Sequence, residues 1–286
     1  MQIENKKIIE IICGNRKLSK TRPLVMGIIN FTPDSFYSQS RAVTEIQISE
    51  RIETMVSEGA DIIDAGAYSS RPGADDVSAA EEIRRLEQGL KILKKIAPDI
   101  PVSIDTFRSE VVECIFDKFG YFIVNDISAG EMDDNMFETV AKFRLPYIAM
   151  HMKGNPQTMQ NNPVYDNLMR EIIAYFTEKI KRLRDVGVND IIIDPGFGFA
   201  KTIEQNYKLL NNLKEFKNFG LPLLVGFSRK SMLYKLLNTT PEKSLNATTV
   251  VNTVALMNGA DILRVHDVRA AVETVEIIEK LKYKNN

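Results

Sequence analysis

The clearest chemical signal in the chain follows a buried run in IIIDPGFGFAKT, residues 191–202. Asp194 ends three consecutive isoleucines and is followed at once by Pro195 and Gly196. A charge at the end of a buried strand is unfavourable unless a partner pairs with it. Glycine lets the backbone turn sharply or lie close to a ligand. Taken alone, the segment fits a helix cap and a tight turn as well as it fits a binding site.

Chemically distinctive groups recur after almost every apolar run of strand length. They are Asn30, the segment 69–72, Asp105, Asn125 with Asp126, Met150 with His151, Asp194, the segment 228–230, and Arg264 with His266. Helix caps need only Ser, Thr, Asn or Asp. The Arg, Lys and His side chains in this set therefore indicate a site rather than a series of caps.

The set contains two kinds of group. Carboxylate and amide side chains make up the first kind: Asp105, Asn125 and Asp194. Such groups match a flat heterocycle that carries an amino group beside a ring N–H. Cationic and hydroxyl side chains make up the second kind: Arg71, Lys230, Arg264 and His266, with Ser69 and Ser70. These suit an anion such as a phosphate or a carboxylate, and a helix expected to start near Ser231 would add backbone N–H groups.

The elements that must position these groups alternate along the chain. Expected strands cover 24–29, 61–66, 101–105, 122–127, 146–150, 190–194, 221–226 and 260–265. Helical periodicity is clearest over 45–59, 78–96, 167–187 and 270–283. Eight units of similar size predict an α/β fold, a closed (β/α)8 TIM barrel, in preference to a doubly wound open sheet. Barrels place their chemistry at the carboxyl ends of the strands, where these groups should converge.

Composition excludes several classes of protein. The 286 residues are 44% hydrophobic and 26% charged with a formal net charge of -1, which is typical of a globular domain without a nucleic-acid or membrane footprint. Two distant cysteines, Cys13 and Cys114, argue against a disulfide framework and favour the cytoplasm. Residues 1–21 are too charged for a signal or a membrane span. We expect them to form a strand or hairpin extension of a single domain, 1–286.

Eight segments, in chain order, resemble the signature segments of the dihydropteroate synthase family of pterin-binding enzymes. They are VMGIINFTPDSF, GADIIDAGAYSSRPGA, VSIDTF, VNDISAG, AMHMKGNPQTMQ, IIIDPGFGFAKT, LVGFSRKS and GADILRVHD. The resemblance runs from about residue 22 to the C-terminus and implies a TIM barrel. It also implies a cytoplasmic transferase of folate biosynthesis that is inhibited by sulfonamides. Such an enzyme joins 6-hydroxymethyl-7,8-dihydropterin diphosphate to 4-aminobenzoate, giving 7,8-dihydropteroate and diphosphate.

The resemblance also assigns roles to residues. Pterin binding falls to Asp105, Asn125, Met150, Asp194, Lys230 and Arg264. The 4-aminobenzoate site falls to Ser70, Arg71, Phe199 and Ser231. The catalytic groups are Lys230, Arg264, His266 and Arg71. Asn30 would be the one protein ligand of a Mg²⁺ ion, because Mg²⁺ on phosphates takes few protein ligands. A homodimer through the late helices, which include NTVALMNGA at 252–260, is implied as well.

Two segments depart from the family pattern. YSQS at 37–40 stands where SDGG is usual, and in GAYSSRP Tyr68 replaces a Glu and Ser70 replaces a Thr. These departures keep two alternatives open: a pterin-binding methyltransferase domain that serves a cobalamin protein, and a non-catalytic pterin carrier. Outside the proposed site, Asp64 is expected to be a structural barrel residue, His151 fits a core histidine, and Arg22 fits a solvated surface charge.

Overall fold

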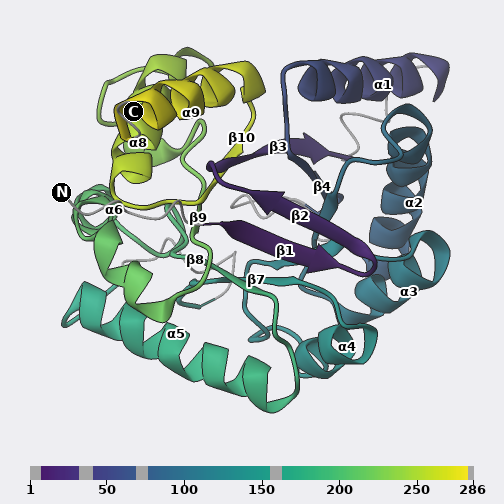
Figure 1. The fold of residues 1–286 in the computed structure, drawn as a ribbon, viewed down its shortest axis with the longest axis horizontal. Coiled ribbons are helices and arrows are strands. Elements are labelled where there is room, and N and C mark those ends of the chain that lie inside the picture. The colour runs from purple at the N-terminus through teal and green to yellow at the C-terminus, as the bar shows by residue number, and fades with distance from the viewer. Residues whose placement is uncertain (1–7, 32–40, 69–76, 155–162, 283–286) are drawn as a thin grey trace.

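Eight parallel strands form a barrel wall in the computed structural model, which describes residues 8–31, 41–68, 77–154 and 163–282 (Figure 1). The strands are β3 (Leu24–Asn30), β4 (Ile62–Gly66), β5 (Val102–Asp105), β6 (Ile123–Asp126), β7 (Tyr147–Met150), β8 (Ile191–Asp194), β9 (Leu224–Val225) and β10 (Ile262–Val265). They lie in the order β8-β7-β6-β5-β4-β3-β10-β9. A parallel bridge between Ile193 and Leu223 joins the two edges of the sheet. The predicted TIM barrel is confirmed.

Seven of the predicted strands agree with the observed ones to within two residues at either end, and the exception is β9. The prediction was 221–226, but only Leu224–Val225 pairs as a regular strand. Pro222 has no N–H to donate to a ladder. Its carbonyl instead accepts from Ile193 N at 3.1 Å, which keeps this edge against β8.

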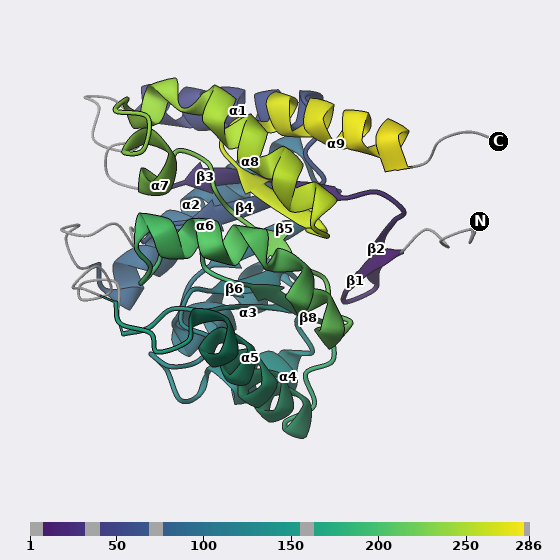
Figure 2. The same ribbon diagram turned by 90° about the vertical axis from the view of Figure 1, so that its left-hand side faces the viewer.

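Helices surround the barrel and follow the strands in sequence (Figures 1 and 2). They are α1 (Arg41–Ser57), α2 (Ala79–Ile96), α3 (Ser109–Phe119), α4 (Met136–Phe143), α5 (Leu168–Asp185), α6 (Ile203–Asn211), α7 (Ser231–Tyr234), α8 (Leu245–Met257) and α9 (Val268–Lys282), with short 3₁₀ turns at Leu213–Phe219 and Pro241–Lys243. Their ends follow local rules. After α1, for example, Gly59 adopts φ +93, a left-handed conformation that suits glycine.

An N-terminal hairpin covers one end of the barrel, as expected for residues 1–21. β1 (Ile9–Cys13) pairs antiparallel with β2 (Arg16–Lys20) through a turn at Gly14, which has φ +62. Ile9 and Ile11 are almost fully buried against the inner layer of the barrel. In Figure 2 the hairpin lies at the right edge and α7 lies at the opposite side. The hairpin therefore closes the amino end of the barrel and leaves the carboxyl end for chemistry.

The prediction for Arg22 was wrong. Its guanidinium forms two hydrogen bonds with the Asp61 carboxylate, at 2.8 and 2.9 Å, instead of standing free in solvent. Asp61 also accepts from Val25 N at 2.9 Å. This pair ties the chain entering β3 to the chain entering β4, so its role is structural.

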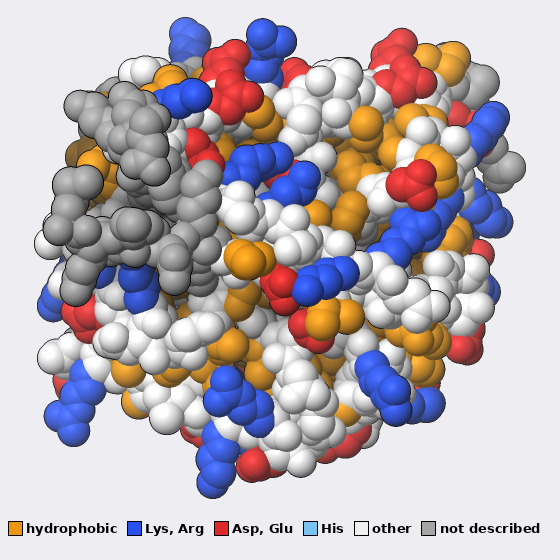
Figure 3. Space-filling view, viewed as in Figure 1, with side chains coloured by type: hydrophobic (Ala, Val, Ile, Leu, Met, Phe, Trp, Pro, Cys, Tyr) orange, Lys and Arg blue, Asp and Glu red, His pale blue; other side chains and the backbone are white. Residues whose placement is uncertain are grey.

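The face that carries the hairpin shows basic and acidic side chains interspersed, without a dominant patch of one sign (Figure 3). This mixture agrees with the net charge of -1. In the part of the chain that the structure describes, none of the helices combines the length and the apolar character needed to cross a membrane.

Candidate functional site at the carboxyl ends of the barrel strands

Alternation along the strands explains why polar groups gather at one end of the barrel. The lower inner layer is apolar and contains Ile62, Ile123, Ile148, Ile192 and Ile262. Side chains of a strand return to the same face every second residue. The residues two positions further on are Asp64, Asn125, Met150, Asp194 and Arg264. On the inward face of each of these strands, an isoleucine in the core is therefore followed two residues later by a residue of the candidate site.

Strand register then aligns several of these residues in a row. Asn30, Gly66, Asp105 and Asn125 are successive partners across β3, β4, β5 and β6. A Cβ atom on Gly66 would lie 3.3 Å from Asn30 Oδ1 and 3.5 Å from Asp105 Cβ. Because Gly66 has no side chain, Asn30 and Asp105 share the space above it.

Arg264 joins the row from β10 by pairing with two carboxylates. Its Nη2 lies 2.5 Å from Asp64 Oδ2 and 2.6 Å from Asp105 Oδ2. Its side chain is 21% exposed, whereas that of Asp64 is fully buried. Burial acts to lower the pKa of Arg264, but Asp64 and Asp105 outweigh it, so the pKa is raised. Arg264 is therefore a permanent cation at the floor of the site.

Asp64 is the structural barrel residue that the sequence suggested, and it is fully buried beneath the site. It accepts from Arg264 Nε at 2.7 Å and from Asn125 Nδ2 at 3.2 Å. It thus holds two of the predicted pterin-binding side chains from the inside of the barrel. Its position two residues after the inward Ile62 is consistent with this role.

Asp194 lies at the end of β8, where Met150 of β7 is its strand partner. Its Oδ1 accepts from Gly196 N at 2.8 Å, so the glycine turn gives the carboxylate one partner within the fold. Burial raises the pKa of Asp194, and Lys230 and the Gly196 N–H oppose that increase. Gly196 adopts φ +71, and a Cβ there would lie 2.0 Å from His151 O. Only glycine fits this turn.

Lys230 reaches the same region from the loop after β9. Its Nζ donates to Phe197 O and lies 4.5 Å from the centre of the Phe199 ring. Burial lowers the pKa of Lys230 to about 8, and Asp194 acts in the opposite direction. A Cβ on Gly198 would lie 2.8 Å from Lys230 Cδ, so the absence of a side chain at Gly198 leaves space for the lysine.

His266 follows β10 and contacts Ser228. Its Nδ1 lies 3.1 Å from Ser228 Oγ, and Arg51 donates to its backbone carbonyl. Burial lowers the pKa of His266 to about 4, and Arg264 and Arg229 act in the same direction. At neutral pH the imidazole is uncharged, so it offers a hydrogen bond to an anion rather than a positive charge.

An apolar wall stands beside the polar groups. Phe107, Ile127, Met150, Met152 and Ala200 form a separate buried cluster, with Tyr68 and Phe199 packed against it. Tyr68 meets Phe107 edge to face, with ring centres 5.1 Å apart. Our interpretation of the sequence included Met150 and Phe199 but missed Phe107 and Ile127. Ile127 directly follows β6 and Phe107 lies two residues after β5, and both strands end in site residues, so that position was the available signal.

Some predicted residues are not placed. Ser70 and Arg71 lie outside the described residues, as do the departures at 37–40. Ser231 begins α7 as expected, but that helix has only four residues, so its dipole adds little. Within the described ranges no group of three or more His, Cys, Asp and Glu side chains could hold a metal. Asn30 is exposed at its strand end and remains the candidate ligand.

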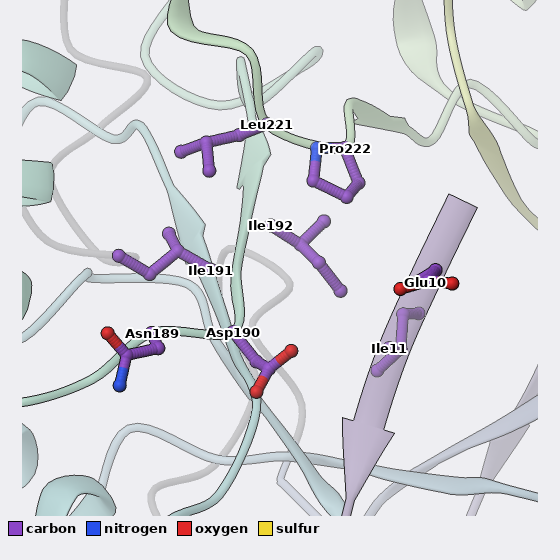
Figure 4. A pocket seen from close by; sticks show the side chains of 8 residues that line it. All are labelled: Glu10, Ile11, Asn189, Asp190, Ile191, Ile192, Leu221 and Pro222. Carbon is purple, nitrogen blue, oxygen red and sulfur yellow. The ribbon is translucent and has the colours of Figure 1, made fainter. Parts of the chain in front are cut away.

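A small cavity lies at the other end of the barrel. It measures about 90 Å³ and is lined by residues of β1, of the start of β8 and of the segment before β9, including Glu10, Asp190 and Pro222 (Figure 4). Asp190 accepts from Ile12 N at 3.4 Å there. None of the predicted site residues lines this cavity, so it is distinct from the candidate site.

Comparison with known proteins shows what this architecture resembles. The profile described as pterin binding enzyme matches residues 26–266. Dihydropteroate synthase of Escherichia coli K12 is 40% identical over 275 residues, which cover 95% of this chain and 96% of that protein. The dihydropteroate synthase of Synechocystis is 42% identical over 263 residues, covering 91% and 90%.

Solved structures agree with the sequence comparison. Xanthomonas albilineans dihydropteroate synthase with 4-aminobenzoic acid superimposes with a TM-score of 0.89 at 33% identity, covering 98% of this chain and all of that one. The Yersinia pestis dihydropteroate synthase in a sulfonamide drug complex gives a TM-score of 0.86 at 38% identity, covering 96% and 99%.

Proposed function

This chain belongs to the pterin-binding enzyme family as a dihydropteroate synthase, and from that premise we propose which of its residues carry each part of the reaction. The reaction joins 6-hydroxymethyl-7,8-dihydropterin diphosphate to 4-aminobenzoate and releases diphosphate, a step of folate biosynthesis. The observation that carries the proposal is the meeting of Asp105 and Arg264 at 2.6 Å, with Asp194 and Lys230 in the same electrostatic cluster.

The pterin ring is held by the carboxylates and amide at the strand ends. Asp194 accepts from the 2-amino group and the adjacent ring N–H, because an ionised carboxylate has acceptor sites beyond the one used by Gly196 N. Asp105 and Asn125 are partners in the register of β5 and β6. They contact the edge of the pterin ring next to the one that Asp194 binds. Lys230 donates to ring acceptors, and Met150 packs against the face of the ring.

Departure of diphosphate comes first in the mechanism that this arrangement supports. The bond between the exocyclic methylene and the diphosphate oxygen breaks, and both electrons leave with the diphosphate. The resulting cation is delocalised into the pterin ring, where Asp105 and Asp194 stabilise it electrostatically. The amine nitrogen of 4-aminobenzoate then bonds to the methylene carbon and loses a proton. The residues Ser70, Arg71, Phe199 and Ser231 border that second substrate.

Arg264, Arg71 and His266 bind the departing diphosphate. Arg264 supplies charge and directional N–H donors, whereas His266 acts as a neutral hydrogen-bonding group. Asn30 would be the protein ligand of a Mg²⁺ ion, because it is an exposed amide at the strand end beside Asp105. One protein oxygen suits an ion whose other ligands are phosphate oxygens and water. When bound, Mg²⁺ supplies positive charge that stabilises the diphosphate oxygens.

A coupled assay tests this function directly. Purified protein with both substrates should form dihydropteroate and diphosphate in equal amounts, faster with Mg²⁺ than with a chelator, and without cobalamin. Pterin binding without diphosphate release would indicate a carrier, and methyl transfer to cobalamin would indicate the methyltransferase alternative. A sulfonamide should compete with 4-aminobenzoate in the same assay.

A homodimer through α8 is the assembly that we propose. Val250, Val254 and Met257 are 55%, 38% and 60% exposed and lie at the i, i+4 and i+7 positions of one helix face. Sedimentation should give the dimer mass for the wild type and the monomer mass for Val254→Glu. The same change at Ile46 on α1, which is 56% exposed, is the control and should leave the dimer intact.

The cytoplasm is the location that we propose for the enzyme. Cys13 and Cys114 are both free thiols in the described structure. Unpaired cysteines are typical of a reducing compartment. Fractionation of cells that express the tagged full chain would check this location.

A further inference from the structure

Two lysines are buried within the described part of the chain, and they differ in their partners. Lys179 of α5 is 1% exposed and pairs with the Glu131 carboxylate. Lys201 is 4% exposed, and its Nζ contacts three neutral groups. These are His151 Nδ1 at 3.0 Å, Gly196 O at 3.0 Å and Phe199 O at 3.1 Å.

The three partners of Lys201 match what a lysine ammonium can offer. An ammonium has three N–H donors, and a buried cation is tolerated when its donors are satisfied. The partners come from two elements, because His151 follows β7 whereas Gly196 and Phe199 belong to the loop after β8. Lys201 therefore connects the end of β7 to both ends of the loop 196–199.

The same loop carries the groups that hold Lys230. Phe197 O accepts from Lys230 Nζ, and the Phe199 ring lies 4.5 Å from it. The middle of the loop is fixed separately, because Gly198 N donates to Asn206 Oδ1 at 2.7 Å. The base of Lys201 is fixed too, since its carbonyl accepts from Asn206 Nδ2 at 3.2 Å. Lys201 thus projects from a fixed point onto the two ends of the loop, while Asn206 of α6 holds its middle.

We infer that Lys201 is a positioning residue whose amine holds the loop 196–199 so that Lys230 faces Asp194, and that it thereby sets the affinity for the pterin. This inference rests on the proposed function for the identity of the ligand. It assigns Lys201 no contact with the substrate, and it goes beyond the pterin-binding set named above. Its effect reaches the ligand through Phe197, Phe199 and Lys230.

Charge on Lys201 should make this positioning dependent on pH. Burial lowers its pKa to about 7, Asp194 acts to raise it, and Lys230 acts to lower it further. The titratable groups that face it are His151 after β7, Asp194 of β8 and Lys230 after β9. Burial also holds the pKa of His151 well below its usual value, so His151 stays neutral. Below about pH 7 the ammonium donates to all three partners, and above it one N–H donor is lost.

The test measures binding of oxidised 6-hydroxymethylpterin by calorimetry, so that catalysis is not needed. Lys201→Met keeps an unbranched side chain that is one atom shorter, and it removes the N–H donors. At pH 6.5 we expect its Kd to rise by about tenfold over the wild type. The ratio of the two Kd values should shrink by pH 9, because the wild type loses its own ammonium. Taking the ratio at each pH removes the part of the Lys230 titration that both proteins share.

Lys179→Met is the matched control, because it removes the other buried lysine, whose hydrogen-bond partner is Glu131 rather than a group of the loop 196–199. It should lower the melting temperature and leave the pterin Kd unchanged. If Lys201→Met fails to fold, Lys201→Gln retains two N–H donors and should give a smaller rise in Kd, of about threefold.

The inference is overturned if folded Lys201→Met or Lys201→Gln binds the pterin as the wild type does. It is also overturned if Lys179→Met weakens binding to the same extent, because a general loss of stability would then explain the effect. Failure of the proposed function gives a different result. In that case the wild-type protein forms no dihydropteroate, whatever the Lys201 variants do to pterin binding.

Discussion

Arg264 and Asp64 stand 200 residues apart in sequence and form a buried ion pair in which Nε and Nη2 both donate to Oδ2, at 2.7 and 2.5 Å. The pair joins β10 to β4 across β3 and fixes the guanidinium at the floor of the site. Asp64 therefore decides where the principal cation of the site lies, although it lies beneath the groups that we propose to touch substrate.

Asp64→Asn should impair both stability and turnover. Removing the charge of Asp64 from this buried pair leaves Asp105 as the remaining ion-pair partner of Arg264, and we expect a loss in the free energy of unfolding on the order of 3 kcal/mol. kcat/KM should fall at least about tenfold, because the guanidinium is no longer held in place. Asp61→Asn is the control: it breaks the pair with Arg22 at the amino end of β4. It should lower stability with kcat/KM intact, and an equal loss of kcat/KM in both variants would contradict the prediction.

Lys230→Ala should abolish coupling of the two substrates and weaken pterin binding. The reason is the loss of the one lysine that faces Asp194 from the loop after β9. Product formation and calorimetric titration with the pterin measure the two effects separately. Lys235→Ala removes an exposed lysine just beyond α7 and serves as the control. Full activity of Lys230→Ala would remove this residue from the site.

Gly198→Ala separates backbone strain from displacement of Lys230. Gly198 and Gly220 have similar φ values, +80 and +67, so alanine at either position should cost roughly 1 to 2 kcal/mol in unfolding free energy. A Cβ at Gly220 meets nothing within 4 Å, whereas a Cβ at Gly198 lies 2.8 Å from Lys230 Cδ. Only Gly198→Ala should raise the pterin Kd, by about tenfold. Equal pterin affinity in the two variants would show that Lys230 relaxes without consequence.

His266 should make stability depend on pH between about 4 and 6.5. Burial lowers its pKa in the folded protein to about 4, so the unfolded chain binds the extra proton first as the pH falls. The contribution is fully present above the unfolded value and is lost as the pH falls towards the folded value. Over this window we expect a loss of roughly 2 to 3 kcal/mol, at about 1.4 kcal/mol per pKa unit. Urea titrations of wild type and His266→Gln isolate it, and identical curves would exclude it.

Ile11→Ala should destabilise the protein without changing substrate affinity. Ile11 is 2% exposed and packs on the inner layer at the amino end of the barrel, so a loss of about 2 to 5 kcal/mol is expected. Ile12 on the other face of the same strand is 45% exposed, and its alanine variant should lose less than about 0.5 kcal/mol. A change in KM for either substrate would contradict the separation between the hairpin and the site.

The two-residue periodicity of the strands was sufficient to predict most of the residues of the site. An apolar residue that faces inward is followed two residues later by a group at the mouth of the barrel, as in Ile192 and Asp194 or Ile262 and Arg264. That spacing is local, so the sequence by itself identified the fold, the strands and the side chains that end them. It also placed the start of a helix at Ser231, because a helix boundary depends on nearby residues.

Tertiary structure alone decided which of these groups meet. Pairing of β3 with β10 and closure of β8 on the segment before β9 bring Arg264 to Asp64 and Asp105, and no local pattern encodes those contacts. The same holds for the contact of Arg22 with Asp61 and for the contacts of Lys201 with the loop 196–199. The sequence around a cationic residue does not show whether its charge faces solvent or pairs with a group from a distant part of the chain. The physical reason is that burial and charge pairing depend on the separation of atoms in space, which the chain sets only once the barrel has closed.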